Sequence, residues 1–356
     1  MKNSAHQIIE QDCEQVLTGS VEQLGGMRGE TLLITGGTGF VGTWITELIA
    51  HLNDHYQFGT RVKLLSSQES NSRFMAPHLG VRKDVEFIRQ DVRTIADLPV
   101  DVTLLIHAAA SPDTRLHASD PLRTIRVITQ GTDAALAAAA RLPRLKRTMN
   151  VSSALIYGAQ SWEVNAMSET YSGGLLDCSS MLSSYAEAKR VGETLVAAYR
   201  NEHRLPIVNI RPFAFIGPYQ RLDRPWAINN FMRDGLLGGP IRILGDGETV
   251  RSYMYASDMA FWFLRILLDG VAGRSFNVGS PVGIRLKDLA EQIGGCFPVP
   301  IPVECRGLID GKGKRSKMIP DVGVAETLLG LSIKVDLETA IQRTLLWNQK
   351  QSGKNE

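Results

Sequence analysis

Hydrophobic residues along the chain form short apolar runs that alternate with longer amphipathic stretches. Six of the short runs are rich in β-branched or leucine residues and are typical of buried parallel strands. They lie at 31–35, 61–65, 85–89, 102–106, 147–151 and 206–210. Apolar residues at helical spacing predict helices between several of them, at 40–52, from 121 to about 140, and at 183–202. Short strands alternating with helices predict an α/β fold with a doubly wound parallel sheet.

The two ends of the chain depart from this alternation. Residues 1–30 precede the first strand, and apolar positions from Ile8 to Leu24 fit one amphipathic helix, which we interpret as a helical extension packed on the main body. After residue 216, Gly-Pro and Gly-Asp-Gly sequences break the chain into short pieces. We therefore expect a main domain over 31–216, completed by part of 256–280. A smaller, interleaved domain is expected mainly over 217–350.

Charge and cysteine content narrow the class of protein. A net charge of +2 gives no electrostatic reason to expect nucleic acid or a membrane as partner. The most apolar stretch, 261–268, is far too short to span a bilayer. The four cysteines have no C-x-x-C spacing, which favours neither disulfides nor a zinc site. The sequence predicts a soluble cytoplasmic protein without a metal.

A glycine-rich segment joins the first strand to the first helix. Gly36, Gly37, Gly39 and Gly42 fall between them. Glycines permit a tight turn and a close approach of the backbone to a ligand, and a helix N-terminus offers free N–H groups and partial positive charge. A strand, a glycine turn and a helix in this order predict a site for a pyrophosphate.

A tyrosine and a lysine are spaced four residues apart near the start of the helix at 183–202. Tyr185 and Lys189 therefore share one face of it. A phenol has an ordinary pKa near ~10 and is a poor base at neutral pH, but a nearby ammonium group favours the phenolate. The pair stands downstream of the glycine turn and of a strand that ends at Ser152 and Ser153. This context favours catalytic chemistry over an exposed helix face.

Six motifs in order make the chain resemble the extended short-chain dehydrogenase/reductase family, and within it the nucleotide-sugar epimerase and dehydratase group. They are TGGTGFVG (35–42), HAAA (107–110), SSALIYG (152–158), YAEAK (185–189), RPFAFIGP (211–218) and GDGETVRSY (245–253). The resemblance implies a Rossmann-type domain that binds NAD or NADP. It also implies that the C-terminal domain binds a nucleoside-diphosphate sugar.

The resemblance also implies roles for particular residues. Tyr185 would be the catalytic base, Lys189 would bind the nicotinamide ribose and tune the tyrosine, and Ser153 would hydrogen-bond the reacting oxygen. Arg251 would hold the substrate diphosphate, with help from Asn230. Residues implied to contact the cofactor are Gly36, Gly39, Phe40, Val41, Gly42, Ser66, Asp91, Val92, Ala108 and Lys189. His107 follows a strand beside the expected cofactor, and we expect no catalytic role for it.

Three positions depart from the family pattern. The second strand ends at Ser66 and Ser67 without the acidic residue that usually binds the ribose 2′-hydroxyl of NAD. These serines could bond that hydroxyl or a 2′-phosphate, and Arg73 could help with the latter, so NADP remains an alternative to NAD. Ala214 stands where the family has an asparagine near the substrate, and Ile128 replaces another asparagine.

The reaction type follows from the positions after Ser153. Family dehydratases place an Asp-Glu pair there and decarboxylases keep a Glu, whereas this chain has Ala154 and Leu155. The resemblance therefore implies a C4 epimerase that works by transient oxidation. A ketoreductase of the same substrates and a non-catalytic NADP sensor are the alternatives.

Family members often pair through the helices at 121–140 and 183–202, so we expect a homodimer. The basic loop 311–317, with Arg315, is a weaker candidate for contact with the diphosphate.

Overall fold

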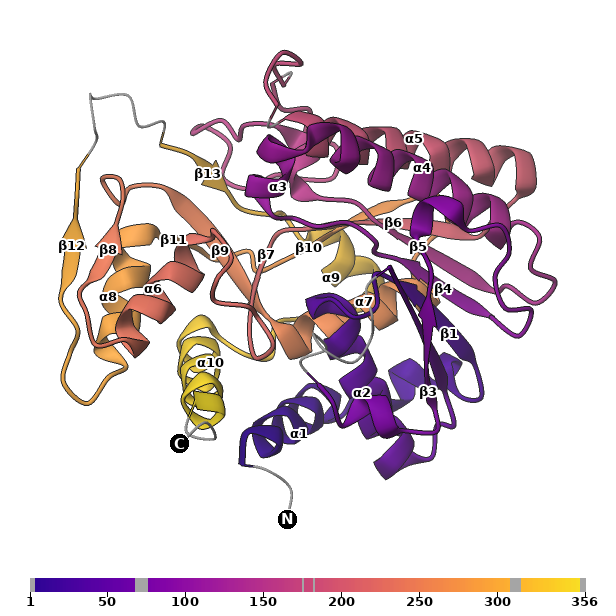
Figure 1. The fold of residues 1–356 in the computed structure, drawn as a ribbon, viewed down its shortest axis with the longest axis horizontal. Helices are drawn as coiled ribbons and strands as arrows, with labels where there is room; N and C mark the ends of the chain where they lie inside the picture. The colour runs from indigo at the N-terminus through magenta and orange to yellow at the C-terminus, as the bar shows by residue number, and fades with distance from the viewer. Residues whose placement is uncertain (1–3, 68–75, 175, 182, 308–314, 353–356) are drawn as a thin grey trace.

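A parallel seven-stranded sheet forms the centre of the computed structural model, which describes residues 4–67, 76–174, 176–181, 183–307 and 315–352. The strand order is β10-β6-β5-β4-β1-β2-β3 (Figure 1). The strands are β1 (Thr31–Thr35), β2 (Arg61–Ser66), β3 (Val85–Arg89), β4 (Leu104–His107), β5 (Arg147–Val151), β6 (Ile207–Pro212) and β10 (Ser275–Val278). This arrangement confirms the predicted doubly wound, Rossmann-type fold.

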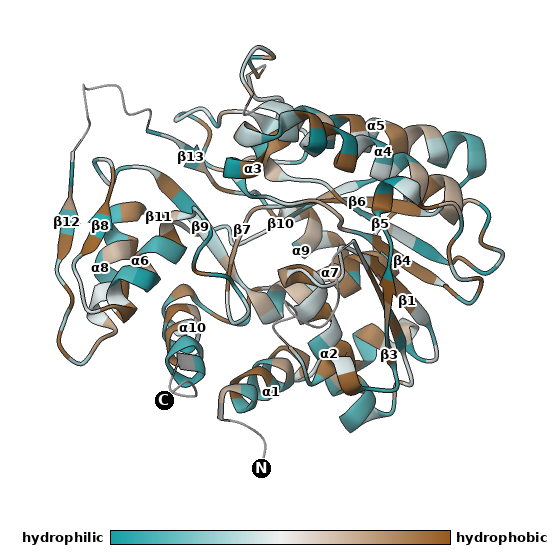
Figure 2. Cartoon of the chain, in the orientation of Figure 1, coloured by the Kyte–Doolittle hydropathy of each residue, from teal (hydrophilic) through white to brown (hydrophobic). Residues whose placement is uncertain are grey.

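Helices cover both faces of the sheet, which explains why central strands such as β1 and β4 are buried along their whole length. One face carries α2 (Phe40–Tyr56) and α7 (Ala256–Asp269), and the other carries α4 (Pro121–Ala139) and α5 (Ser183–His203) (Figure 1). Figure 2 shows hydrophobic residues concentrated in strands such as β1, β4 and β6, between these layers. In β1 every residue is buried.

The apolar stretch at 261–268 belongs to α7, where it is largely buried against the sheet. α7 packs against α2, and β10 follows it in the chain and extends the sheet beside β6. Within the described residues, no helix combines the length and apolarity needed to cross a bilayer.

The N-terminal segment forms two short elements rather than the single helix expected from Ile8 to Leu24. α1 (Ser4–Leu17) is followed by a 3₁₀ helix, η1 (Val21–Met27). Gly19 separates them with a φ of +69°, a left-handed conformation that ends helices and that glycine adopts at little cost. α1 packs against α2, α7 and the C-terminal helix α10 (Leu337–Ser352), so α1 and α10 lie side by side (Figure 1).

A smaller region stands beside the large sheet and has its own hydrophobic core. Its strands are β7 (Ala214–Ile216), β9 (Val250–Tyr255), β11 (Gly283–Arg285) and β13 (Lys317–Met318), with a separate pair of β8 (Ile241–Ile243) and β12 (Val303–Cys305). α6 (Ala227–Leu236), α8 (Leu286–Gly295) and α10 pack against them. A further helix, α9 (Gly323–Leu329), returns to pack on α7 and β10 of the large sheet.

Candidate active site

The glycine turn lies at the edge where the parallel strands end. Gly36 has a φ of +69°, and a Cβ there would lie 2.9 Å from Cα of Ala109, in the segment that follows β4. Only glycine fits this close packing without strain. Gly39 is exposed and is the N-cap residue of α2, so no side chain caps that helix. The turn therefore presents free backbone N–H groups to an anion.

Residues from three further segments reach the same edge. Thr38 Oγ1 donates to Ser66 Oγ at 3.1 Å, which joins the end of β2 to the glycine turn. Ala108 follows β4, and its N–H donates to Thr35 Oγ1 at 3.2 Å. Asp91 follows β3 and caps η3 (Val92–Thr94), where a hydrogen bond from the Arg93 guanidinium lowers the pKa of its carboxyl group.

This edge fits a dinucleotide. A glycine turn that a Cβ would fill and an uncapped helix N-terminus suit a pyrophosphate, and the Ser66 hydroxyl suits a ribose. Phe40 and Val41 open α2 and are partly buried, while Val92 is buried beside the sheet. Arg73 lies outside the described residues, as does most of the loop 311–317.

The catalytic trio predicted from the sequence is assembled around the start of α5. Tyr185 and Lys189 lie one turn apart on α5, and Ser153 follows β5. Ser153 and Tyr185 are hydrogen-bonded through their side chains. Lys189 Nζ donates to the Val151 carbonyl at 2.6 Å and lies 5.8 Å from the centre of the Tyr185 ring. All three side chains are buried.

Burial shifts the pKa values of Tyr185 and Lys189. It raises the pKa of Tyr185 to about 12, and the hydrogen bond with Ser153 partly opposes this shift. Burial lowers the pKa of Lys189 to about 8, against the attraction of Glu193, one turn further along α5. A positive charge added beside the phenol would favour the phenolate, because a nearby opposite charge stabilises an anion.

Two neighbours of Tyr185 were not identified as such from the sequence. Ile128, which replaces the family asparagine, is buried with Tyr185 and Ala188 in one apolar cluster and so contributes to the desolvation of the phenol. The His117 ring stacks on the Tyr185 ring, with centroids 4.3 Å apart, and its Nε2 lies 2.8 Å from the Ser111 carbonyl.

His117 belongs to a helix that the hydrophobic pattern did not reveal, α3 (Thr114–Ser119). α3 is only six residues long, too short for a clear period. The one local signal is the N-cap Asp113, which accepts from the Arg115 N–H. Asp113 also pairs with Arg224 at 2.7 Å and so ties this segment to the loop before α6.

His107 has no free nitrogen for catalysis. Its Nδ1 lies 2.9 Å from Thr35 Oγ1, and its Nε2 lies 3.1 Å from Thr132 Oγ1. Complete burial, with some help from the Lys189 charge, lowers the pKa of His107 to about 3, so the ring is neutral. Its hydrogen bonds fix the end of β4 beside the glycine turn.

The residues expected to bind substrate lie in the smaller region. Arg251, on β9, donates to the Ser316 hydroxyl at 2.8 Å, and none of the carboxylates that the structure describes is paired with it. Burial lowers the pKa of its guanidinium. Asn230, on α6, accepts from Arg233 at 3.0 Å. Arg315 instead pairs with Asp246 at 2.6 Å. Ala214 is paired with Tyr253 in the β7–β9 ladder.

Comparisons with known proteins agree with this fold. The family model described as "NAD dependent epimerase/dehydratase family" matches residues 32–279. A curated relative, UDP-glucuronic acid decarboxylase 1 of Xenopus tropicalis, is 26% identical over 323 residues, which cover 90% of this chain and 72% of the relative.

Two solved structures have the same fold. UDP-glucose 4-epimerase from Thermotoga maritima superposes with a TM-score of 0.75 at 21% identity, covering 90% of this chain and 99% of the other. A dTDP-glucose 4,6-dehydratase from Streptomyces venezuelae, solved with NAD bound, gives 0.77 at 23% identity, covering 91% and 98%. Because the family model spans well over half of the sequence, the chain belongs to the NAD dependent epimerase/dehydratase family and is an NAD-dependent enzyme.

Proposed function

We propose that this protein is a nucleotide-sugar epimerase that acts at C4 of the sugar with bound NAD. The observation that carries the proposal is the buried trio of Ser153, Tyr185 and Lys189. The two residues that follow Ser153 in the chain, Ala154 and Leu155, have side chains that can neither give nor accept a proton. The resemblance of the motifs to nucleotide-sugar enzymes supports the substrate class.

In this proposal residues along the carboxyl edge of the sheet would hold the cofactor. The glycine turn and the start of α2 would hold the pyrophosphate, through Gly36, Gly39, Phe40, Val41 and Gly42. Ser66 bonds the adenosine ribose, and Lys189 bonds the nicotinamide ribose. Asp91, Val92 and Ala108 enclose the adenine and the dinucleotide from β3 and β4. When bound, NAD supplies a hydride acceptor for the sugar carbon and, in its oxidised form, a positive charge beside the phenol.

The chain's own residues handle the proton. Tyr185 removes the proton from the C4 hydroxyl, and Ser153 orients that oxygen through its own hydrogen bond. Lys189 supplies positive charge that stabilises the phenolate during the reaction. Tyr185 then returns the proton to the same oxygen, and hydride return to the opposite face of C4 would give the epimer. The substrate diphosphate is held by Arg251, whose planar guanidinium suits phosphate oxygens, and by Asn230.

The environment after Ser153 supports epimerisation over elimination of water. Ala154 is buried and Leu155 is exposed, and both side chains are hydrocarbon. Elimination needs an acid for the leaving hydroxyl and a base for the C5 proton. Hydride transfer at one carbon needs only Tyr185, Lys189 and Ser153.

The curated relatives favour a second candidate, because they are UDP-glucuronic acid decarboxylases. Oxidation of a uronic acid at C4 gives a β-keto acid, which loses carbon dioxide readily. The same trio would catalyse that oxidation. Against this candidate stands the absence of the glutamate that the decarboxylases keep after the hydroxyl residue, since this chain has Ala154 and Leu155 there.

Assembly, compartment and domain roles complete the proposal. Leu122 and Ile125 on α4 and Val191 on α5 are large apolar side chains exposed to solvent, which supports a homodimer through these helices. Sedimentation should show a dimer at micromolar concentration, and Leu122→Glu should shift it to the monomer.

All four cysteines are unpaired, which supports a location in the cytoplasm. We assign cofactor binding to 31–216 and nucleotide-sugar binding mainly to 217–350.

A product assay tests the proposal. The purified protein is incubated separately with UDP-glucose, UDP-N-acetylglucosamine and UDP-glucuronic acid, and the products are identified by NMR. We expect a C4 epimer from one of them without added cofactor. Release of carbon dioxide would support the decarboxylase candidate. Consumption of reduced cofactor with a 4-keto sugar would indicate a ketoreductase, and a 4-keto-6-deoxy product from UDP-glucose would contradict the proposal.

A further inference from the structure

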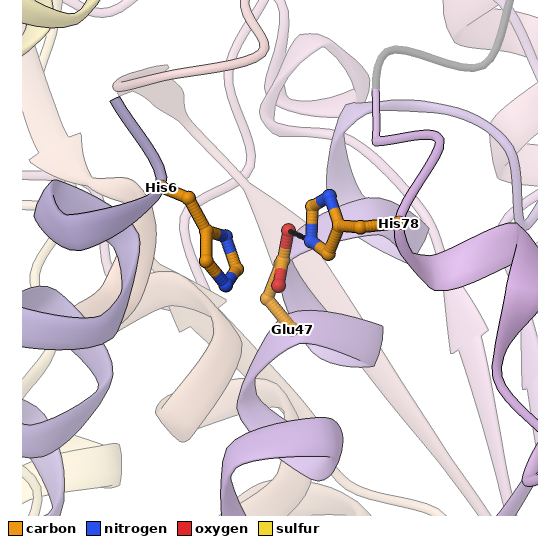
Figure 3. A group of neighbouring side chains, drawn as sticks. All are labelled: His6, Glu47 and His78. Carbon is orange, nitrogen blue, oxygen red and sulfur yellow. Dashed lines mark ion pairs between the residues drawn. The ribbon is translucent and has the colours of Figure 1, made fainter. Parts of the chain in front are cut away.

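Two histidines and a glutamate from three separate segments converge beside the N-terminal helix. His6 lies on α1, Glu47 lies on α2, and His78 immediately precedes η2 (Leu79–Val81). One potential ligand atom from each lies within 4.8 Å of those of the other two. Figure 3 shows the two imidazole rings on either side of the Glu47 carboxylate. α2 and α5 cover opposite faces of the sheet, so this cluster is separate from the catalytic trio.

The side chains in this cluster are positioned as ligands rather than as a simple hydrogen-bonded pair. Nε2 of His78 lies 2.9 Å from Oε1 of Glu47, which is ion-pair distance. The contact does not meet the geometry of a hydrogen bond, and this buried nitrogen forms no hydrogen bond with any described residue. The His6 and His78 rings meet edge to face, with centroids 4.4 Å apart and planes at 62°. Both rings therefore stay close to the carboxylate without stacking flat on each other.

The carboxylate of Glu47 also accepts a hydrogen bond, on the same oxygen that lies nearest His78. The Glu47 side chain is 4% exposed, and the Tyr219 hydroxyl donates a hydrogen bond to its Oε1 at 2.5 Å. Tyr219 is itself fixed by edge-to-face contacts with Trp44 and Trp347. A buried carboxylate is costly unless cationic or hydrogen-bonding groups compensate for it. An outer partner that orients the carboxylate, inside an apolar shell, is the usual surrounding of a metal ligand.

We infer that His6, Glu47 and His78 bind a zinc ion. Two imidazole nitrogens and one carboxylate oxygen form a donor set that zinc favours over magnesium or calcium, which prefer oxygen ligands. Ligand atoms around tetrahedral zinc stand roughly 3.3 Å apart, given zinc–ligand bonds of about 2.0–2.1 Å. Small side-chain rotations would bring this cluster to that spacing. Water would complete the coordination.

The site would join three parts of the chain that are distant in sequence. Zinc would clamp α1 of the N-terminal extension to α2, the helix that follows the glycine turn, and to the segment that leads into β3. Binding to the folded protein alone stabilises it in proportion to the logarithm of the ion concentration. The proposal gives the N-terminal extension a metal-dependent attachment to the cofactor-binding unit, whatever sugar the enzyme uses.

Zinc titration of the full chain tests this inference. The exposed cysteines Cys178 and Cys305 are rival zinc ligands, so both are changed to serine in the background protein. The chelator-treated protein is then titrated with zinc chloride, and with magnesium chloride for comparison, by calorimetry. We expect one zinc per chain with a dissociation constant in the micromolar range or tighter, no heat from magnesium, and a melting temperature that rises with zinc.

Variants distinguish this site from adventitious binding. His78→Ala and His6→Ala should each weaken zinc binding by more than about 100-fold, and Tyr219→Phe by roughly 10–100-fold because it removes the partner that orients Glu47. His203→Ala, at the end of α5, is the matched control and should bind zinc as tightly as the background protein. Circular dichroism confirms that each variant is folded. Absence of zinc binding in the background protein, or equal binding in His78→Ala and His203→Ala, would overturn the inference.

Discussion

The cofactor edge and the proposed substrate region are built in different ways. The cofactor edge consists mainly of backbone, with the glycine turn, the start of α2 and the ends of parallel strands in fixed register. The substrate region consists of side chains on short strands and helices, such as Arg251 on β9 and Asn230 on α6. A backbone site is preformed, whereas a side-chain site depends on how distant segments meet. Substitutions should therefore affect cofactor binding, chemistry and substrate binding separately.

The largest effect is expected for the residue that handles the proton. Tyr185→Phe keeps the ring and its stacking on His117 but removes the proton acceptor, so turnover should fall by roughly 10²–10⁴ with NAD binding intact. Steady-state kinetics on the nucleotide sugar measure this. Tyr199→Phe, on the same helix, is the control, since the Tyr199 hydroxyl bonds only to Asp133 among its described neighbours. Near-normal turnover in Tyr185→Phe would remove this residue from the mechanism.

A second substitution tests the backbone site. Gly39→Val places a side chain at the exposed N-cap of α2, where it should block the pyrophosphate and weaken NAD binding by roughly tenfold or more. Folding should survive, because a Cβ there comes no closer than 3.2 Å to the Gly36 carbonyl oxygen. Calorimetric titration with NAD gives the affinity, and Gly239→Val in an open turn is the control. Unchanged affinity would place the pyrophosphate elsewhere.

Arg251 tests the side-chain site. Arg251→Ala should weaken nucleotide-sugar binding by roughly 10–100-fold, the range for a lost hydrogen bond to a charged group, and leave NAD binding unchanged. Arg315→Ala should have a smaller effect, because Asp246 already pairs with that guanidinium. Both ligands are titrated into both variants. An equal loss of NAD and sugar affinity in Arg251→Ala would contradict the separation of the two regions.

The smallest effect concerns a buried carboxyl group that joins α7 to the segment before α10. Asp258 on α7 accepts N–H groups from Lys334 and Val335, and burial raises the pKa of its carboxyl group to about 7. Folded Asp258 holds its proton more tightly than the unfolded chain does, so its stabilisation is complete below about pH 4 and is lost as pH rises through about 7.

Asp258→Asn removes this titration. The melting temperature of the variant relative to the parent should therefore increase by a few degrees between about pH 5 and about pH 8. Thermal scans of both proteins at several pH values measure the difference. A difference that stays constant with pH would show that Asp258 is not the titrating group.

The sequence predicted best what depends on local pattern. The six strands and the helices at α2, α4 and α5 are long or apolar enough to show their period, and the glycine turn has a fixed chemical meaning. The trio Ser153, Tyr185 and Lys189 was identified through its resemblance to a family, and the structure brings these residues together. The break at Gly19 was missed, because the apolar period continues across it while the backbone turns.

What depends on distant contacts could not be predicted in this way. The stacking of His117 on Tyr185 requires the short helix α3 to pack beside α5, and the six residues of α3 contain no pattern that predicts this contact. The pairing of Arg315 with Asp246 joins residues 69 positions apart. The expectation of no metal rested on cysteine spacing, and the proposed zinc ligands share no motif because they come from α1, α2 and the segment before β3.

One measurement tests the central claim that Tyr185 and its neighbours carry out reversible hydride transfer at a single carbon. The purified enzyme is mixed with a nucleotide sugar that it binds, while NMR follows the sugar and absorbance follows reduced nicotinamide. The account predicts many turnovers to the C4 epimer on bound NAD, with no net accumulation of reduced cofactor, and loss of this activity in Tyr185→Phe. Stoichiometric consumption of reduced cofactor, or a 4-keto-6-deoxy product from an unmodified hexose nucleotide, would contradict it.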